Sequence, residues 1–342
     1  MNRTKLIHLL FSAKGVALFS ALLLLFLIVL ASFVDWPVVI DMLSQADRRL
    51  LAAGALLLLA GYGFYAVRWR YLMKDIPGLF HVFHTANVGN MVNTLLPLRP
   101  GDAIRILMLA NNGRPPALMV TSSIVVERWL ETIMRMAALG GAFIFGAGAA
   151  VSGLTVIGSL AFLAISFLFM VWLVQQRQKA LEIIPPWLGR LPRLEEDDAR
   201  RWLEHLIEGL NGVSSLRRLL VALIHSVITW SLFWGFHYLS LVALGPDLPI
   251  EQLLGISLGS LALVPPSATT LPGVFQVSMV APLILMGYDS ALLTSYALVL
   301  NIISMLMVVG LGVWGTLSAG LTLRQLASQA EVAALEEAEE HV

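Results

Sequence analysis

The sequence predicts an all-α polytopic membrane protein with about six full transmembrane helices and two opposed re-entrant or discontinuous helices. Of the 342 residues, 58% are hydrophobic and only 13% are charged, whereas soluble domains are closer to half apolar and a quarter charged. Apolar stretches of about 20 residues recur along the chain, and a helix needs that length to cross the hydrocarbon of a bilayer. A chain of this composition has too little polar surface to coat its core in water, so lipid is its expected solvent.

Charge and cysteine content exclude several other classes of protein. Lys+Arg and Asp+Glu both number 22, so the net charge does not indicate a nucleic-acid partner. The absence of cysteine excludes disulfides, thiolate metal sites and a cysteine nucleophile. The sequence contains no visible Ser/His/Asp set, phosphate-binding loop or dinucleotide fingerprint, and the pair His81 and His84 lacks a third metal ligand. We therefore expect no catalytic residues, no metal and no cofactor.

Six stretches are long and apolar enough to be predicted as full spans. They are Val16–Val34, Leu50–Val67, Pro116–Ala149, Thr155–Val174, Leu219–Leu244 and Leu292–Leu323. The first is long for a signal sequence and has no small-residue cleavage site after it, so we expect it to be retained.

Two further apolar stretches are broken by prolines. The first, Leu79–Leu96, resumes as Asp102–Ala110, and the second, Leu253–Val264, resumes as Val274–Met286. Proline removes a backbone donor and disfavours helix in the residue before it, and open backbone at membrane depth is tolerated only against protein or a watery cavity. Both stretches are therefore predicted as discontinuous or re-entrant helices. The break residues are Pro97, Gly101, Pro265, Pro266, Pro272 and Gly273.

Basic residues indicate the orientation. They concentrate before the first span, after the second span, where Arg68, Arg70 and Lys74 lie, and in the loop 175–218. We therefore expect both termini and that loop in the cytoplasm. The two broken helices would then enter from opposite sides, an arrangement that allows an inverted repeat and that many transporters use to build a substrate site near the midplane.

The chain is expected to form one integral membrane domain over residues 1–330, followed by an acidic cytoplasmic tail at 331–342. Within the loop 175–218, Asp198–Asn211 has an apolar face typical of an interfacial amphipathic helix, although a plain helical linker accounts for it about as well. Trp69 lies near the end of a span and is expected to anchor it at the interface, and His237 is expected to pack or hydrogen-bond between helices.

The most informative polar residues flank the first break. Arg99 and Arg105 lie on either side of Asp102, at the point where a helix is expected to begin. Unpaired backbone amides and guanidinium groups together suit a phosphate, because the arginine fork matches two phosphate oxygens. The alternative is that both arginines only anchor the helix by extending to the cytoplasmic interface.

A second set of charges lies inside the span Pro116–Ala149. Glu127, Glu131 and Arg135 share one helical face, and Arg128 can reach Glu131 one turn away. Charged groups at membrane depth are expensive and normally face the interior of the bundle. We expect these acids to hold the arginines of the break in place, with direct proton or ion coupling as the alternative.

The two motifs together resemble a known family. The string Gly89-x-x-x-Asn93-x-x-Leu96-Pro97-x-Arg99-x-Gly101-Asp102-x-x-Arg105, followed by Glu127-Arg128-x-x-Glu131, is similar to the lysylphosphatidylglycerol synthase transmembrane family, also called flippase-like domain proteins. That family includes the membrane half of the multiple peptide resistance factors, and no soluble transferase domain is seen in this chain. The resemblance covers nearly the whole chain.

The resemblance implies that an anionic or polyprenyl-phosphate-linked lipid is moved between leaflets of a bacterial inner membrane. The residues expected to bind this lipid are Asn93, Arg99, Asp102, Arg105, Glu127, Arg128 and Glu131. A non-catalytic membrane partner of a glycolipid or cell-envelope biosynthesis enzyme and an intramembrane lipid-phosphate transferase are the alternatives, and a homo-oligomer stays open.

The chain departs from the family pattern at several positions. Asp102 stands where Glu is usual and Glu131 where Asp is usual, which preserves the charge. In the second half, Gln276 and Asn301 stand where members tend to carry Glu and Arg. The charge of the second half is therefore lost, which puts in doubt any mechanism that needs it.

Overall fold

The structure is a computed structural model that describes residues 36–95, 100–110, 115–146, 175–188, 216–245, 247–265 and 274–319, together with residues 158, 161, 165, 168, 169, 172 and 200. The regular elements in these residues are all α-helices, as predicted. They are α3 (Trp36–Gln45), α4 (Arg48–Leu72), α5 (Leu79–Leu95), α6 (Gly101–Ala110), α7 (Ala117–Gly146), α9 (Arg177–Leu188), α11 (Leu216–Leu244), α12 (Ile250–Leu263), α13 (Val274–Leu285) and α14 (Ser290–Ser318).

Three helices, α4, α11 and α14, are long and apolar enough to cross a membrane. They coincide with the spans predicted to begin at Leu50, Leu219 and Leu292. Helix α7 is the longest, with 30 residues, which gives a length of about 45 Å, but it carries the buried charges described below. The predicted span Val16–Val34, the tail 331–342, and most of Thr155–Val174 and of the amphipathic segment Asp198–Asn211 lie outside the described residues. The count of six spans therefore stays a prediction.

Aspartates fix where two of the spans begin. The Asp47 side chain accepts hydrogen bonds from Arg49 N and Leu50 N at the start of α4, and the Asp289 side chain accepts one from Leu292 N at the start of α14. These contacts satisfy amides that have no partner within the helix. Both apolar runs therefore begin as helices at a defined residue.

Helices α4 and α11 pack against each other in opposite directions. At one end Asp47 N donates to Ala243 O over 3.1 Å, and near the other end Arg68 Nη1 donates to Ser226 Oγ over 3.4 Å. Between these ends a Cβ on Gly61 would meet the Phe233 ring. Glycine is needed there because the aromatic ring occupies the space of a side chain.

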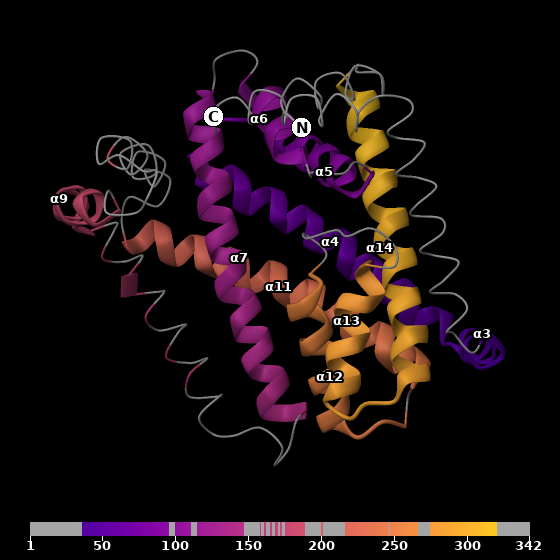
Figure 1. Ribbon diagram of the computed structural model, residues 1–342. Helices are drawn as coiled ribbons and strands as arrows, with labels where there is room; N and C mark the ends of the chain where they lie inside the picture. Colours follow the sequence, from indigo (N-terminus) through magenta and orange to yellow (C-terminus); the bar gives the residue numbers. More distant parts are fainter. Residues whose placement is uncertain are drawn as a thin grey trace, which may run out of the picture.

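The helices from α4 to α7 and from α11 to α14 form two sets of the same design. Their lengths are 25, 17, 10 and 30 residues in the first set and 29, 14, 12 and 29 in the second. Helix α5 packs on α14 as α12 packs on α7, and the first helices of the two sets pack on each other. This exchange of partners, together with the antiparallel packing of α4 on α11, is the arrangement expected of an inverted repeat. Figure 1 shows α7 and α14 upright on opposite sides of the bundle, and α4 and α11 run obliquely behind them.

Each predicted break separates a pair of short helices, α5 and α6 in one set and α12 and α13 in the other. Helix α6 folds back on α5, because Gly101 lies against Gly89. In the second set Gly259 of α12 lies beside Leu283 of α13. None of the four helices is long enough to span the hydrocarbon alone. That they enter the membrane from opposite sides stays a prediction.

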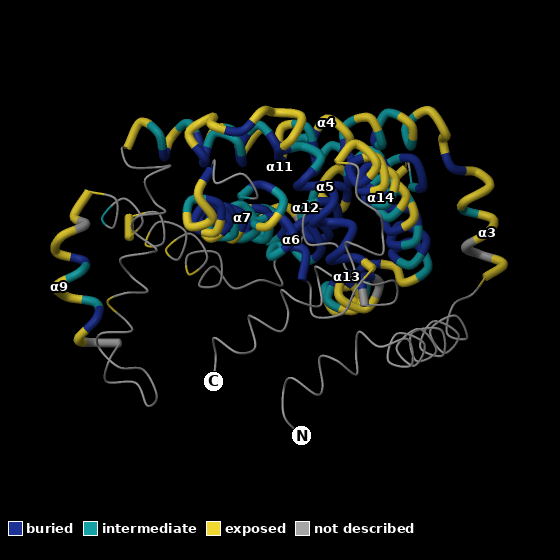
Figure 2. The backbone as a smooth tube through the Cα atoms, turned by 90° about the horizontal axis from the view of Figure 1, so that it is seen from above, coloured by how far each residue is buried: buried dark blue, intermediate teal, exposed yellow. Residues whose placement is uncertain are grey.

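Helix α5 lies in the interior of the described bundle. Eleven of the 17 residues of α5 are buried, whereas exposed positions follow the outer side of α4 and α11 in Figure 2. The exposed residues of those two helices include Leu56, Phe64, Leu220, Ile224 and Val227. An apolar outer surface, with charged residues buried inside the bundle, suits a lipid solvent.

Candidate functional site: an ion-pair network joining α4, α6 and α7

The junction of α5 and α6 positions the site. Gly101 N donates to Asn93 Oδ1 over 2.6 Å, and a Cβ on Gly101 would collide with the Gly89 carbonyl oxygen. The aliphatic part of Arg105 packs on Gly89 in the same way. Two glycines and an asparagine thus bring α6 against α5, and the first turn of α6 then directs Asp102 and Arg105 toward α7.

Arg105 is held by side chains of α4 and α7. Its Nη1 and Nη2 donate to Glu127 Oε1 and Oε2 over 3.0 and 2.8 Å, and both side chains are fully buried. The guanidinium lies 3.8 Å from the Trp69 ring centroid. Tyr65 donates a hydrogen bond to Glu127, and Trp69 Nε1 donates to Ser123 Oγ over 2.9 Å. A two-pronged pair stacked on an aromatic face is a strong and directional contact for arginine.

A second buried pair joins α4 to α7. Arg68 Nη2 donates to Glu131 Oε1 over 3.1 Å, and the Arg68 guanidinium lies 5.0 Å from the Tyr65 ring centroid. Arg68 is fully buried, and α4 continues past it to Leu72. The placement of Arg68 after the span was therefore wrong, because it is a buried residue of α4 that pairs with Glu131 inside the bundle.

The remaining pair lies at the edge of the network. Arg128 Nη2 donates to both carboxylate oxygens of Asp102, over 2.9 and 3.0 Å, and its Nη1 donates to Glu131 over 3.2 Å. Asp102 also accepts from Arg105 Nη1 over 3.2 Å. The side chains of Arg128 and Asp102 are 33% and 37% exposed, in contrast to the buried pairs. The network therefore has a closed interior and one open edge.

The network balances its charges. Arg68, Arg105 and Arg128 face Asp102, Glu127 and Glu131, so three positive charges meet three negative ones. A buried charge without a partner costs several kcal/mol, whereas a paired and hydrogen-bonded one is tolerated. Each buried acid accordingly has an arginine partner.

The structure brings together six of the seven residues predicted to bind lipid. Asn93 positions α6, and the ionic network contains Asp102, Arg105, Glu127, Arg128 and Glu131. Arg99 and Pro97 lie outside the described residues. Arg68, Tyr65 and Trp69 belong to the same site and were missed. Trp69 was expected to anchor the helix at the interface, but it is fully buried.

The second break is only partly described. Pro265 follows Val264, the C-cap residue of α12. Pro266, Pro272 and Gly273 lie outside the described residues, as does the side chain of Gln276. Asn301 is nearly buried on α14. Where the first set has charges, the second has neutral groups: His237 Nδ1 lies 2.8 Å from Ser260 Oγ, and Tyr296 donates to the His237 carbonyl oxygen over 2.9 Å. His237 thus hydrogen-bonds between helices, as expected.

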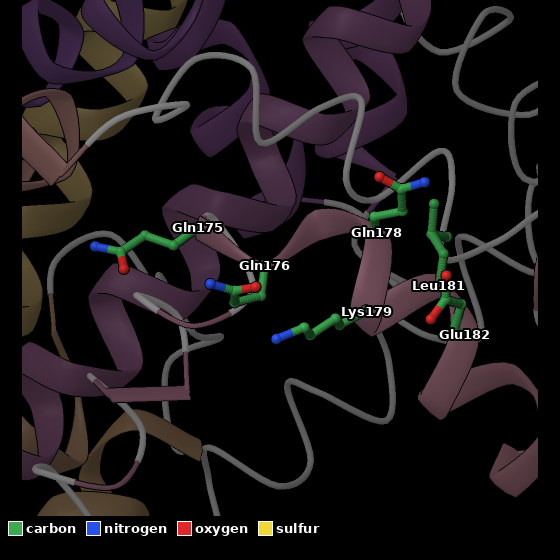
Figure 3. A pocket seen from close by; sticks show the side chains of 6 residues that line it. All are labelled: Gln175, Gln176, Gln178, Lys179, Leu181 and Glu182. Carbon is green, nitrogen blue, oxygen red and sulfur yellow. The ribbon is translucent and has the colours of Figure 1, made fainter.

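A hollow at α9 lies apart from this network. It is lined by Gln175, Gln176, Gln178, Lys179, Leu181 and Glu182, whose side chains Figure 3 shows at the start of the helix. None of these residues belongs to the ion pairs. Among the described residues, no group of three or more His, Asp or Glu side chains is placed to hold a metal ion.

Comparison with known proteins agrees with the motifs. Residues 12–312 match the family described as the lysylphosphatidylglycerol synthase TM region. Searches of curated proteins and of solved structures gave no match.

Proposed function

Since the chain belongs to the lysylphosphatidylglycerol synthase TM family, we propose that it moves an anionic phospholipid or a polyprenyl-phosphate-linked lipid between the leaflets of a bacterial inner membrane. The observation that carries the proposal is the balanced ion-pair network beside the α5–α6 hairpin. Charges inside a lipid-embedded bundle are costly and mark substrate or ion pathways. Short helices that meet inside a bundle are a common place for such a pathway.

The proposal gives different roles to the interior and to the edge of the network. Arg105 is stacked on Trp69, and its two terminal nitrogens are bound to Glu127. It therefore positions α6 against α7. Arg128 lies at the open edge, where a phosphate headgroup can reach it, and its planar fork suits two phosphate oxygens.

Reconstitution tests the proposal directly. The purified protein is inserted into vesicles that contain a trace of acyl-labelled fluorescent phosphatidylglycerol, and a membrane-impermeant reductant is added outside. In vesicles without protein, bleaching stops when the outer leaflet is consumed. With the protein, we expect the label of the inner leaflet to be bleached as well, because lipid crosses.

The same assay with labelled phosphatidylcholine measures headgroup selectivity. We expect slower bleaching of the zwitterionic lipid, since its net charge does not match the exposed arginine. The proposal fails if correctly folded protein leaves the inner-leaflet phosphatidylglycerol and a polyprenyl-phosphate probe untouched. A binding partner in the envelope-synthesis machinery would then be the better hypothesis.

A further inference from the structure

The six charges of the network differ in how far the solvent or a lipid headgroup can reach them. Arg68, Arg105 and Glu127 are fully buried, and Glu131 is 5% exposed as a side chain. Only Asp102 and Arg128 are partly exposed. A ligand that approaches the network therefore meets this one pair first.

In the Asp102–Arg128 contact, one guanidinium nitrogen, Arg128 Nη2, donates to both carboxylate oxygens of Asp102, over 2.9 and 3.0 Å. A lipid phosphate also carries negative charge and offers acceptor oxygens to a guanidinium. We propose that Asp102 is an internal competitor of the lipid phosphate: its carboxylate occupies Arg128 in the empty protein and leaves it when an anionic headgroup binds. This inference rests on the proposed function, since it concerns the same site.

Both partners keep other contacts when they separate. Asp102 retains Arg105, whose Nη1 lies 3.2 Å away, and Arg128 retains Glu131, also at 3.2 Å. Neither charge is left unpaired, so the large penalty for a lone buried charge does not arise. By contrast, displacing Glu127 from Arg105 would break two hydrogen bonds between fully buried groups. The edge pair is therefore the one that an anion can open at low cost.

Charge balance gives the inference a definite sign. Among the described residues the six charges of the network sum to zero, so a bound headgroup adds one negative charge to them. Replacing Asp102 with a neutral residue raises their sum to one positive charge, and the headgroup then brings it back to zero. Removal of an acid should therefore strengthen the binding of an anion instead of weakening it.

The experiment measures binding to the full-length protein in detergent, with short-chain phosphatidylglycerol as the anionic probe and short-chain phosphatidylcholine as the zwitterionic one. Asp102→Asn is expected to bind phosphatidylglycerol with a Kd roughly tenfold lower than that of wild type. Asp102→Glu keeps a competing carboxylate and should not show this gain. Asp102→Ser serves as the neutral variant if the Asn protein is not recovered.

Two controls separate competition at Arg128 from a general change of charge. Asp75 is an exposed acid paired with Arg70 in the turn after α4, so Asp75→Asn alters the net charge equally and should leave binding unchanged. The double variant Asp102→Asn/Arg128→Gln should lose the gain.

Inorganic phosphate is then added as a competitor. If it competes with phosphatidylglycerol, the gain is due to the phosphate group itself. If it does not compete, the gain is due to the lipid headgroup with its chains.

Three results would overturn the inference. The first is that neutral variants at Asp102 bind phosphatidylglycerol no more tightly than wild type. The second is an equal gain in Asp75→Asn, and the third is a gain that persists without Arg128. The transport assay is independent of this test. If wild type moves no lipid but Asp102→Asn binds phosphatidylglycerol more tightly, the translocase proposal fails and the competitor role of Asp102 stands.

Discussion

The two halves of the molecule share an architecture but differ in chemistry. The first set, α4 to α7, joins its helices with three arginines and three acids. In the second set, α11 to α14, the counterpart helices are joined by an imidazole and hydroxyl groups, in the cluster of His237, Ser260 and Tyr296. Among the described residues, neutral groups thus join three helices of the second set, α11, α12 and α14. In the first set the ties are charged groups, whose burial at membrane depth is costly.

The largest expected effect comes from breaking the most buried pair. Glu127→Gln leaves the Arg105 charge uncompensated inside the bundle and should destabilise the protein by about 3–5 kcal/mol. The yield of monodisperse protein and its thermal unfolding measure the effect. The double variant Glu127→Gln/Arg105→Gln removes both charges and should recover yield without recovering lipid movement. A fully stable Glu127→Gln protein would show that the pair is not the tie that the geometry indicates.

The hairpin junction gives the next largest effect. Gly101→Ala places a methyl group against the Gly89 carbonyl oxygen, and overpacking of this kind costs about 1–3 kcal/mol. Since α6 carries Asp102 and Arg105, transport should fall together with the unfolding temperature. Gly63 in α4 is the matched control, because a Cβ there meets nothing within 4 Å. Gly63→Ala should be neutral or stabilising, as Ala is favoured over Gly inside a helix. Equal melting temperatures for the two variants would contradict the close approach of α5 and α6.

In the second half, Tyr296→Phe should have a smaller effect. The change removes the hydrogen bond from the phenol to the His237 carbonyl oxygen, which is worth about 1 kcal/mol. Thermal unfolding should therefore shift slightly while lipid movement continues at the wild-type rate. If Tyr296→Phe abolishes transport without unfolding the protein, the neutral cluster takes part in the pathway and the contrast between the halves is wrong.

Hydropathy was sufficient to predict the long apolar helices, because a span of about 20 residues has few alternative structures. The cost of intramembrane charge likewise placed Glu127 and Glu131 inside the bundle. Arg68 was misassigned because an arginine at the end of an apolar run is normally a cytoplasmic anchor. Its pairing with Glu131 is a contact between distant parts of the chain, and no local pattern records it.

The inverted repeat was allowed by the sequence but not evident in it. The two sets differ in the residues that pack them, and an apolar helix tolerates many substitutions of similar volume. The two sets still share one sequence pattern at their breaks, where Pro97 precedes Pro100-Gly101 and Pro265 precedes Pro272-Gly273. Proline and glycine recur there because each break must stop one helix and begin another, whatever the neighbouring side chains do.

The smallest effect on folding, and a clear effect on function, is expected at the open edge. Arg128→Lys keeps the charge at a partly exposed pair, so stability should change by less than about 1 kcal/mol. An ammonium group cannot present the planar fork that binds two oxygens, and transport should fall roughly tenfold for a loss of about 1.4 kcal/mol of headgroup interaction. Arg70 is a matched control, since it is 34% exposed and lies outside the network, paired with Asp75. Arg70→Lys should leave the bleaching rate unchanged. Unaltered transport in Arg128→Lys would mean that a positive charge at this edge is sufficient and that the guanidinium fork does not recognise the phosphate.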